Sequence, residues 1–158
     1  MPKSNLDSFV QYVGYIRNGL SEMYGSCLLT KHGRQPLCSI DDMNLAHCYH
    51  PHFLLFPNAP AIAKGASECF KTVEKFTDFM SAMNFATTLE GYFFVSQSEK
   101  EYMVMSPTGA MPRQFARVLV SMVVNKSEMA GWRDCPQYES AVMNAKSNKV
   151  VFEGGRGN

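Results

Sequence analysis

Hydrophobic residues near the N-terminus recur at steps of three and four, the spacing that places side chains on one face of an α-helix. The positions that follow this period are Leu6, Phe9, Val10, Val13, Ile16, Leu20 and Met23. They predict a helix over residues 5–24 that ends at Gly25. Gly14 and Gly19 each weaken such a helix by about 1 kcal/mol relative to alanine, so packing against the rest of the protein must stabilise it.

The next pattern predicts a β-hairpin. Apolar residues at 27–30 and 36–40 flank a polar turn, in which Gly33 suits a left-handed backbone position. Three basic side chains gather at the tip of this turn: Lys31, His32 and Arg34. We regard them as candidate binding residues, with an ordinary solvated turn as the alternative.

Residues 61–84 again show helical spacing. The apolar positions of this segment are Cys69, Phe70, Val73, Phe76, Met80 and Met83. The opposite positions are charged, as on the solvated face of a surface helix. The pattern therefore predicts a second long helix.

The following segment changes to a strand-like composition. Aromatic and β-branched residues at 92–95 and 102–105 flank a polar turn, which predicts a hairpin, and residues 87–89 begin a further strand. A third helix is predicted next, with Pro112 as its first residue. Its apolar stripe consists of Phe115, Val118, Leu119, Met122 and Val123.

The last predicted elements are a short helix over residues 137–146 and an edge strand over residues 150–152. Taken together, the elements define an α+β fold, a meandering antiparallel sheet with about three main helices packed on it. We expect a single domain over residues 1–153. The glycine-rich tail, residues 154–158, has nothing to bury and is expected to be flexible.

This element order resembles that of the roadblock, longin and profilin group of small adaptor folds. The resemblance is carried by the segments 28–34 and 89–95 and covers about residues 4–125. The histidine-rich insert and the last thirty or so residues depart from that pattern. The resemblance implies a binding platform without catalysis, often dimeric.

Composition limits the functions that the chain can have. The chain has 158 residues, 46% of them hydrophobic, which suffices for one core without disulfides. A formal net charge of +1 provides no field that would attract nucleic acid or an anionic membrane. No apolar run approaches the ~20 residues of a membrane span or forms a signal peptide. The five cysteines are scattered, which favours a reducing, cytoplasmic location: Cys27, Cys38, Cys48, Cys69 and Cys135.

Three of the four histidines lie between residues 47 and 52. Zinc is bound by imidazole and thiolate groups, and the donors here would be His47, Cys48, His50 and His52. The spacing provides no second ligand pair to complete a tetrahedral shell, so surface histidines that bind no cofactor are the simpler interpretation. An enzyme with Cys48 as nucleophile and a neighbouring histidine as base is a further alternative.

A second group of candidate residues lies near the third predicted helix. The segment 106–110 precedes this helix, and Arg113 and Arg117 lie on the helix itself. This arrangement could hold a small anion such as a nucleotide. The segment has a single glycine and is not a phosphate-binding P-loop.

The function that these observations favour is a non-catalytic protein-binding module. Aromatic residues at 92–94 and 102 lack an accompanying basic strip, so we expect core packing and not nucleic-acid stacking. Eleven methionines suit an adaptable protein-binding surface. We therefore expect an adaptor, or a small inhibitor of the kind that viruses and mobile elements encode, whose partner is another protein or a second copy. The candidate binding residues are Lys31, His32, Arg34, His47, His50, His52, Arg113 and Arg117.

Overall fold

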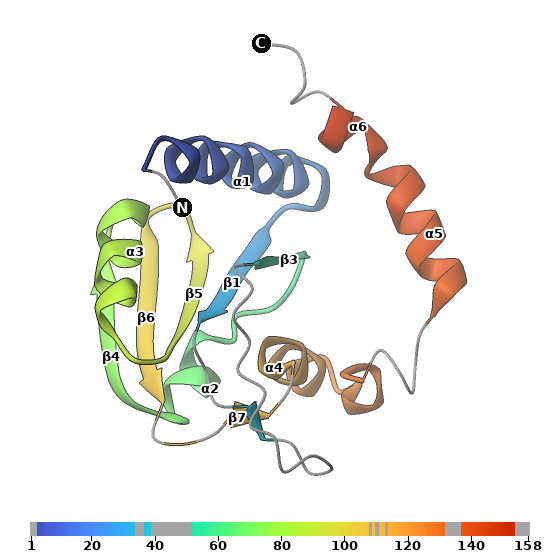
Figure 1. The fold of residues 1–158 in the computed structure, drawn as a ribbon. Helices are drawn as coiled ribbons and strands as arrows, with labels where there is room; N and C mark the ends of the chain where they lie inside the picture. Colours follow the sequence, from blue (N-terminus) through green and yellow to red (C-terminus); the bar gives the residue numbers. More distant parts are fainter. Residues whose placement is uncertain are drawn as a thin grey trace.

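The computed structural model describes residues 3–33, 37–38, 52–107, 109, 111–112, 114–131 and 137–153. Its centre is an antiparallel sheet of five strands in the order β3-β1-β5-β6-β4. These strands are β1 (Cys27–Gly33), β3 (Phe53–Pro57), β4 (Phe70–Phe76), β5 (Tyr92–Ser98) and β6 (Glu101–Pro107). Two short strands, β2 (Leu37–Cys38) and β7 (Met111–Pro112), form a separate parallel pair. The α+β fold with an antiparallel sheet is therefore confirmed (Figure 1).

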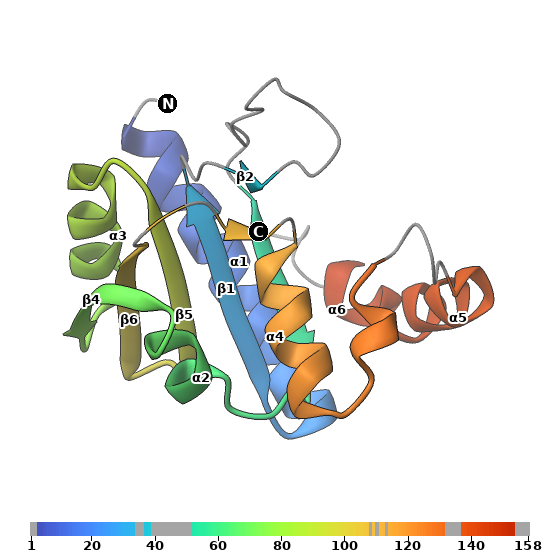
Figure 2. The ribbon, with the colours of Figure 1, turned by 90° about the horizontal axis from the view of Figure 1, so that it is seen from below.

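Helices cover both faces of the sheet (Figures 1 and 2). The helices are α1 (Lys3–Tyr24), α2 (Ala63–Ser67), α3 (Phe79–Thr88), α4 (Phe115–Val123), α5 (Tyr138–Ser147) and α6 (Lys149–Glu153), with a 3-10 turn, η1 (Ser127–Met129). Helices α1 and α3 pack on the face that carries Leu29, Phe94 and Tyr102. Helices α2 and α4 pack on the other face, against Leu28 and Phe93.

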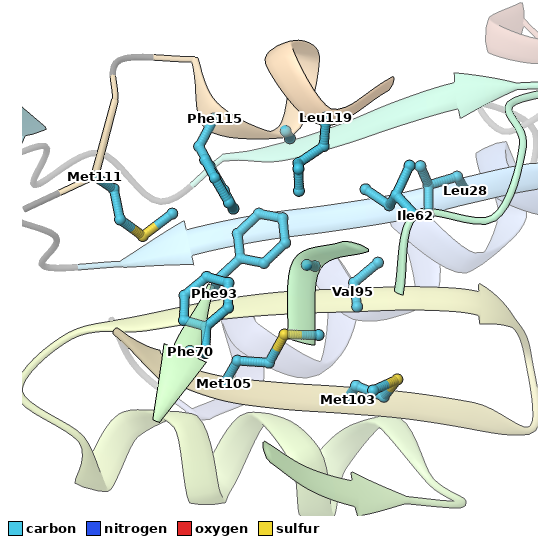
Figure 3. Packing of buried hydrophobic residues seen from close by; sticks show 12 residues of the cluster. Leu28, Ile62, Phe70, Phe93, Val95, Met103, Met105, Met111, Phe115 and Leu119 are labelled. Atoms are coloured by element: carbon cyan, nitrogen blue, oxygen red, sulfur yellow. The ribbon is translucent and has the colours of Figure 1, made fainter. Parts of the chain in front are cut away.

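The core under α4 is rich in aromatic rings (Figure 3). Phe93 is fully buried, and its ring stacks on that of Phe70 with 5.6 Å between the centroids. The Phe115 ring from α4 meets Phe93 edge to face at 5.2 Å. Strand β5 is thus buried on both faces, which explains its continuous run of apolar residues.

Four predicted elements are confirmed. Helix α1 ends at Tyr24, and Gly25 follows with a φ of +86°, as expected for a glycine that stops a helix. The hairpin of β5 and β6, the helix α4 and the short helix α5 all lie where the patterns predict them. Helix α4 begins later than expected, because Pro112 belongs to β7. The predicted strand at 87–89 is wrong, since this segment is the end of α3.

The predicted hairpin after α1 is wrong. Strand β1 continues through the polar residues and pairs with β3 on one side and β5 on the other. Lys31 tolerates this position because its ammonium group lies between two aromatic rings. Gly33 has no left-handed backbone; the Tyr92 ring occupies the space where its Cβ would be. This glycine therefore permits a close contact between strands and does not form a turn.

The predicted helix over residues 61–84 is also wrong, because β4 separates α2 from α3. The sequence spacing is misleading here since a register irregularity lies between Phe70 and Thr72. Phe70 and Val73, three residues apart, therefore pack in the same cluster, as they would on a helix. Phe76 packs in the cluster on the opposite face, as the alternation of a strand requires.

Residues 150–152 form part of α6 and not the predicted edge strand. Helix α6 packs on α1, where Val151 covers Gly19 and would contact any Cβ at that position. The Tyr24 hydroxyl donates to Asn148 Oδ1 at 2.8 Å and reinforces this contact. Gly19 thus has a packing role, whereas a Cβ at Gly14 would meet no atom within 4 Å.

Candidate functional site

The structure brings together three of the predicted binding residues. Lys31 and His32 lie at the end of β1, and His52 directly precedes β3. Because Lys31 pairs with Phe53 in the antiparallel register, His32 lies opposite His52. The two imidazole rings meet edge to face, with 4.9 Å between their centroids and an interplanar angle of 89°.

The other predicted residues do not join this group in the described structure. Arg117 lies on α4, where its Nη2 donates to the carbonyl oxygen of Met129 at 3.5 Å and links α4 to η1. The remaining candidates lie outside the described residues: Arg34, His47, Cys48, His50 and Arg113. Within residues 52–107 and the other described ranges, no three histidine, cysteine or acidic side chains lie close enough to hold a metal ion. Of the four predicted zinc donors only His52 is described, so the zinc site stays a prediction.

Burial dominates the electrostatics of His32. The Lys31 side chain is 7% exposed, and its ammonium nitrogen lies 5.5 Å from the Phe53 ring centroid and 5.4 Å from that of Tyr92. The pKa of His32 is lowered to about 4, first by burial and then by the nearby charges of His52 and Lys31. His32 is therefore neutral at pH 7, with one ring nitrogen as donor and the other as acceptor.

This lowered pKa predicts a loss of stability in mild acid. Below pH 6.5 the unfolded chain binds a proton at His32 that the folded chain excludes until about pH 4. The free energy of unfolding should therefore fall over this range by about 1–3 kcal/mol after solvent screening is allowed for. Urea titrations of the wild type and of His32→Gln at pH 7 and pH 5 measure the effect. Equal losses in both proteins would show that His32 does not titrate in this way.

A cavity of about 250 Å³ lies between α1 and the sheet, and the sequence did not predict it. Its lining comes from α1, β1, α3, β6 and the β5–β6 turn and consists of Val10, Val13, Gly14, Arg17, Leu29, Phe79, Glu99 and Tyr102. The signal in the sequence is Arg17, a cation in phase with the buried residues Val13 and Leu20. A charge on the apolar face of a helix must find partners inside the protein.

Arg17 is 4% exposed and connects α1 to two strands. Its Nε donates to the carbonyl oxygen of Cys27 at 3.1 Å, and Nη2 donates to that of Ser96 at 3.2 Å. A side-chain hydrogen bond also joins the guanidinium to Tyr102. Burial lowers the pKa of Arg17 and raises that of Tyr102. Burial also raises the pKa of the Cys27 thiol to about 11, so this cysteine is no thiolate nucleophile at neutral pH.

A third feature is the apolar surface of α5 and α6, which we call the C-terminal arm (residues 138–153). No residue of α5 is buried, and α5 stands away from the layers of the sheet and its helices in both views (Figures 1 and 2). Tyr138, Ala141, Val142 and Ala145 share one face of α5 by their spacing. Tyr138 is 74% and Val142 53% exposed. The arm thus presents an apolar helix face to solvent.

Comparison with known proteins gives no match for this chain. No protein-family model, no curated protein and no solved structure is significantly similar to it. Among the helices that the structure describes, none is long and apolar enough to cross a membrane. Any function must therefore be argued from the geometry of the chain itself.

Proposed function

We propose that this protein is a non-catalytic protein-binding module that recognises its partner through the C-terminal arm. The observation that carries the proposal is the exposure of Tyr138 and Val142 on a helix without a buried residue. A helix of 10 residues is marginal in water on its own and gains stability when its apolar face is covered. A binding partner would provide that cover.

The chemistry of the arm suits a protein interface. Tyrosine, methionine and phenylalanine are enriched in such interfaces, and the arm exposes Tyr138, Met143 and Phe152. Tyrosine also anchors many interfaces because its ring buries a large area at little cost in conformational entropy. Lys149 and Glu153 pair with each other at 3.5 Å. The other two charges of the arm, Glu139 and Lys146, are of opposite sign, so the arm has no net charge and the apolar groups are the main basis of recognition.

The proposal agrees with the kind of protein that the resemblance to small adaptor folds implies. The sheet and its two helix layers would act as the scaffold, and the arm as the binding element. Such a module would serve as an adaptor or as a small inhibitor of another protein. Self-association through the same face is the alternative outcome of the experiment below.

The test places a charge in the apolar face. Val142→Glu should reduce partner binding at least tenfold, because a carboxylate would be buried without a counter-charge. Photo-crosslinking from residue 142 in native cells identifies the partner, and affinity measurements with the purified partner compare the wild type with Val142→Glu. Because Val142 is 53% exposed, the circular dichroism and melting temperature of the variant should not change.

Ser140→Glu provides the matched control, since it adds the same charge to the same helix on the side opposite Val142. It should bind as the wild type does. Equal affinity of Val142→Glu and the wild type would contradict the proposed role of the arm. A crosslink to a second copy of the chain, with a concentration-dependent mass in ultracentrifugation, would assign the arm to self-association.

A further inference from the structure

The cavity beside Arg17 lies between α1, α3 and the sheet and contains no residue of the C-terminal arm. We propose that it binds a small organic monocarboxylate with an apolar body, whose carboxylate group pairs with Arg17. The inference is independent of the proposed protein-binding function. It rests on the buried guanidinium, on the apolar walls of the cavity and on the open space at Gly14.

In the described part of the chain, the buried guanidinium of Arg17 has no counter-charge in direct contact, although the exposed Glu99 acts on it electrostatically. Buried guanidinium groups in proteins are normally paired with a carboxylate. Arg17 is 4% exposed, yet its hydrogen-bond partners are two backbone carbonyls and the Tyr102 hydroxyl, all of them neutral. Within the described residues Arg17 forms no ion pair. A carboxylate in the cavity would supply the missing negative charge.

Arg17 and Tyr102 both have hydrogen-bond donors to spare. A guanidinium has more N–H groups than the three acceptors around Arg17 require. Tyr102, which accepts from Arg17, keeps its own O–H as a donor. Both side chains line the cavity, so they can approach the two oxygens of one carboxylate together.

The cavity also has the lining and the size that an apolar ligand body requires. Its walls beside Arg17 are apolar and include Val13, Leu29 and Phe79. Gly14 faces it without a packing role, because a Cβ there would meet no atom within 4 Å. A volume of about 250 Å³ equals that of about eight water molecules at ~30 Å³ each in the liquid. This size corresponds to a short branched acid such as 4-methylpentanoate.

The charge at the rim selects against other anions. Glu99 lines the cavity and is exposed, and its charge acts on both Arg17 and Tyr102. A single carboxylate that pairs with Arg17 brings only one negative charge into the cavity that Glu99 lines. A phosphate or phosphate ester has more negative charge and more polar oxygens than the apolar walls and this rim accommodate. The cavity therefore fits a monocarboxylate better than a nucleotide.

Isothermal titration calorimetry of the full chain with sodium 4-methylpentanoate at pH 7 tests the proposal. We expect saturable binding with a Kd in the millimolar range or below. The neutral 4-methylpentanamide and inorganic phosphate should each bind at least tenfold more weakly. No heat of binding with 10 mM acid, or equal affinity for the acid and its amide, would overturn the proposal.

Two glycine variants separate occupation of the cavity from effects on the fold. Gly14→Leu should abolish binding of 4-methylpentanoate because its side chain fills the space beside Arg17. The control is Gly65→Ala on α2, which lies outside the cavity lining and adds one methyl group in open space, and it should retain the wild-type affinity. Glu99→Gln should tighten binding about two- to fivefold, since it removes a like charge from the rim. Unchanged binding by Gly14→Leu would place the acid elsewhere and refute the site.

Discussion

Phe93→Ala is expected to lower the free energy of unfolding by about 3–5 kcal/mol. Phe93 is fully buried at the centre of the sheet, and its ring contacts the rings of Phe70 and Phe115 (Figure 3). The truncation leaves a cavity that these two rings cannot fill, because one belongs to β4 and the other to α4. The loss is a large part of the 5–15 kcal/mol that stabilises an ordinary domain.

Urea unfolding followed by circular dichroism measures this loss. Phe93→Leu, which keeps most of the volume, should cost less than about 1.5 kcal/mol and remains measurable if the alanine variant does not fold. Phe152→Ala is the surface control, because Phe152 is 42% exposed, and should cost less than about 1 kcal/mol. A loss below 1 kcal/mol for Phe93→Ala would show that α4 does not pack on the sheet as described.

The second large effect is expected at Arg17. Arg17→Met retains an unbranched apolar side chain but removes the donors to the carbonyl oxygens of Cys27 and Ser96. Loss of these two buried, charge-assisted hydrogen bonds should lower the free energy of unfolding by about 2–4 kcal/mol. Removing Arg17 also removes the free-energy cost of burying its charge. The net loss of stability is therefore smaller than the sum of the costs of losing the two hydrogen bonds.

Thermal and urea unfolding of Arg17→Met measure the effect, with Lys75→Met as the matched control. Lys75 pairs with Glu101 at 3.5 Å, but both side chains are more than half exposed, so this change should cost less than about 1 kcal/mol. If Arg17→Met is as stable as the wild type, the guanidinium does not hold α1 against the sheet. A lower free energy of unfolding for Arg17→Met supports a structural role for Arg17 alongside the proposed binding role.

Local periodicity was sufficient for the elements whose pattern depends on short-range spacing. Helix α1 follows from the sequence because its apolar residues keep the helical spacing. The hairpin of β5 and β6 follows because two apolar, aromatic-rich runs flank a short polar turn, and the register shift lies next to that turn, between Val95 and Ser98. The segment 61–84 could not be assigned correctly, since the irregularity at Phe70 gives a strand the spacing of a helix. Such a feature depends on the partner strand β6, which the local sequence does not contain.

The candidate sites show the same limit. The contact between His32 and His52 follows from the register of β1 with β3. The local sequence predicts a turn at His32 and does not indicate that β3 is the partner of β1. Arg17 was overlooked because a single charge in an apolar stripe does not change the predicted helix. The role of Arg17 depends on its hydrogen bonds to the carbonyl oxygens of Cys27 and Ser96. These two oxygens lie close together only because β1 and β5 are neighbours in the sheet.

The position of β1 in the middle of the sheet has a consequence for synthesis on the ribosome. Strand β1 leaves the ribosome early, but its partner β5 begins at Tyr92, almost sixty residues after β1 ends. Until then one hydrogen-bonding edge of β1 is open, and Leu28 and Leu29 lack the cover that the later elements supply. The nascent chain therefore exposes an open strand edge and apolar side chains, the features that make folding intermediates prone to aggregation, and the sheet can be completed only after β5 and β6 have emerged.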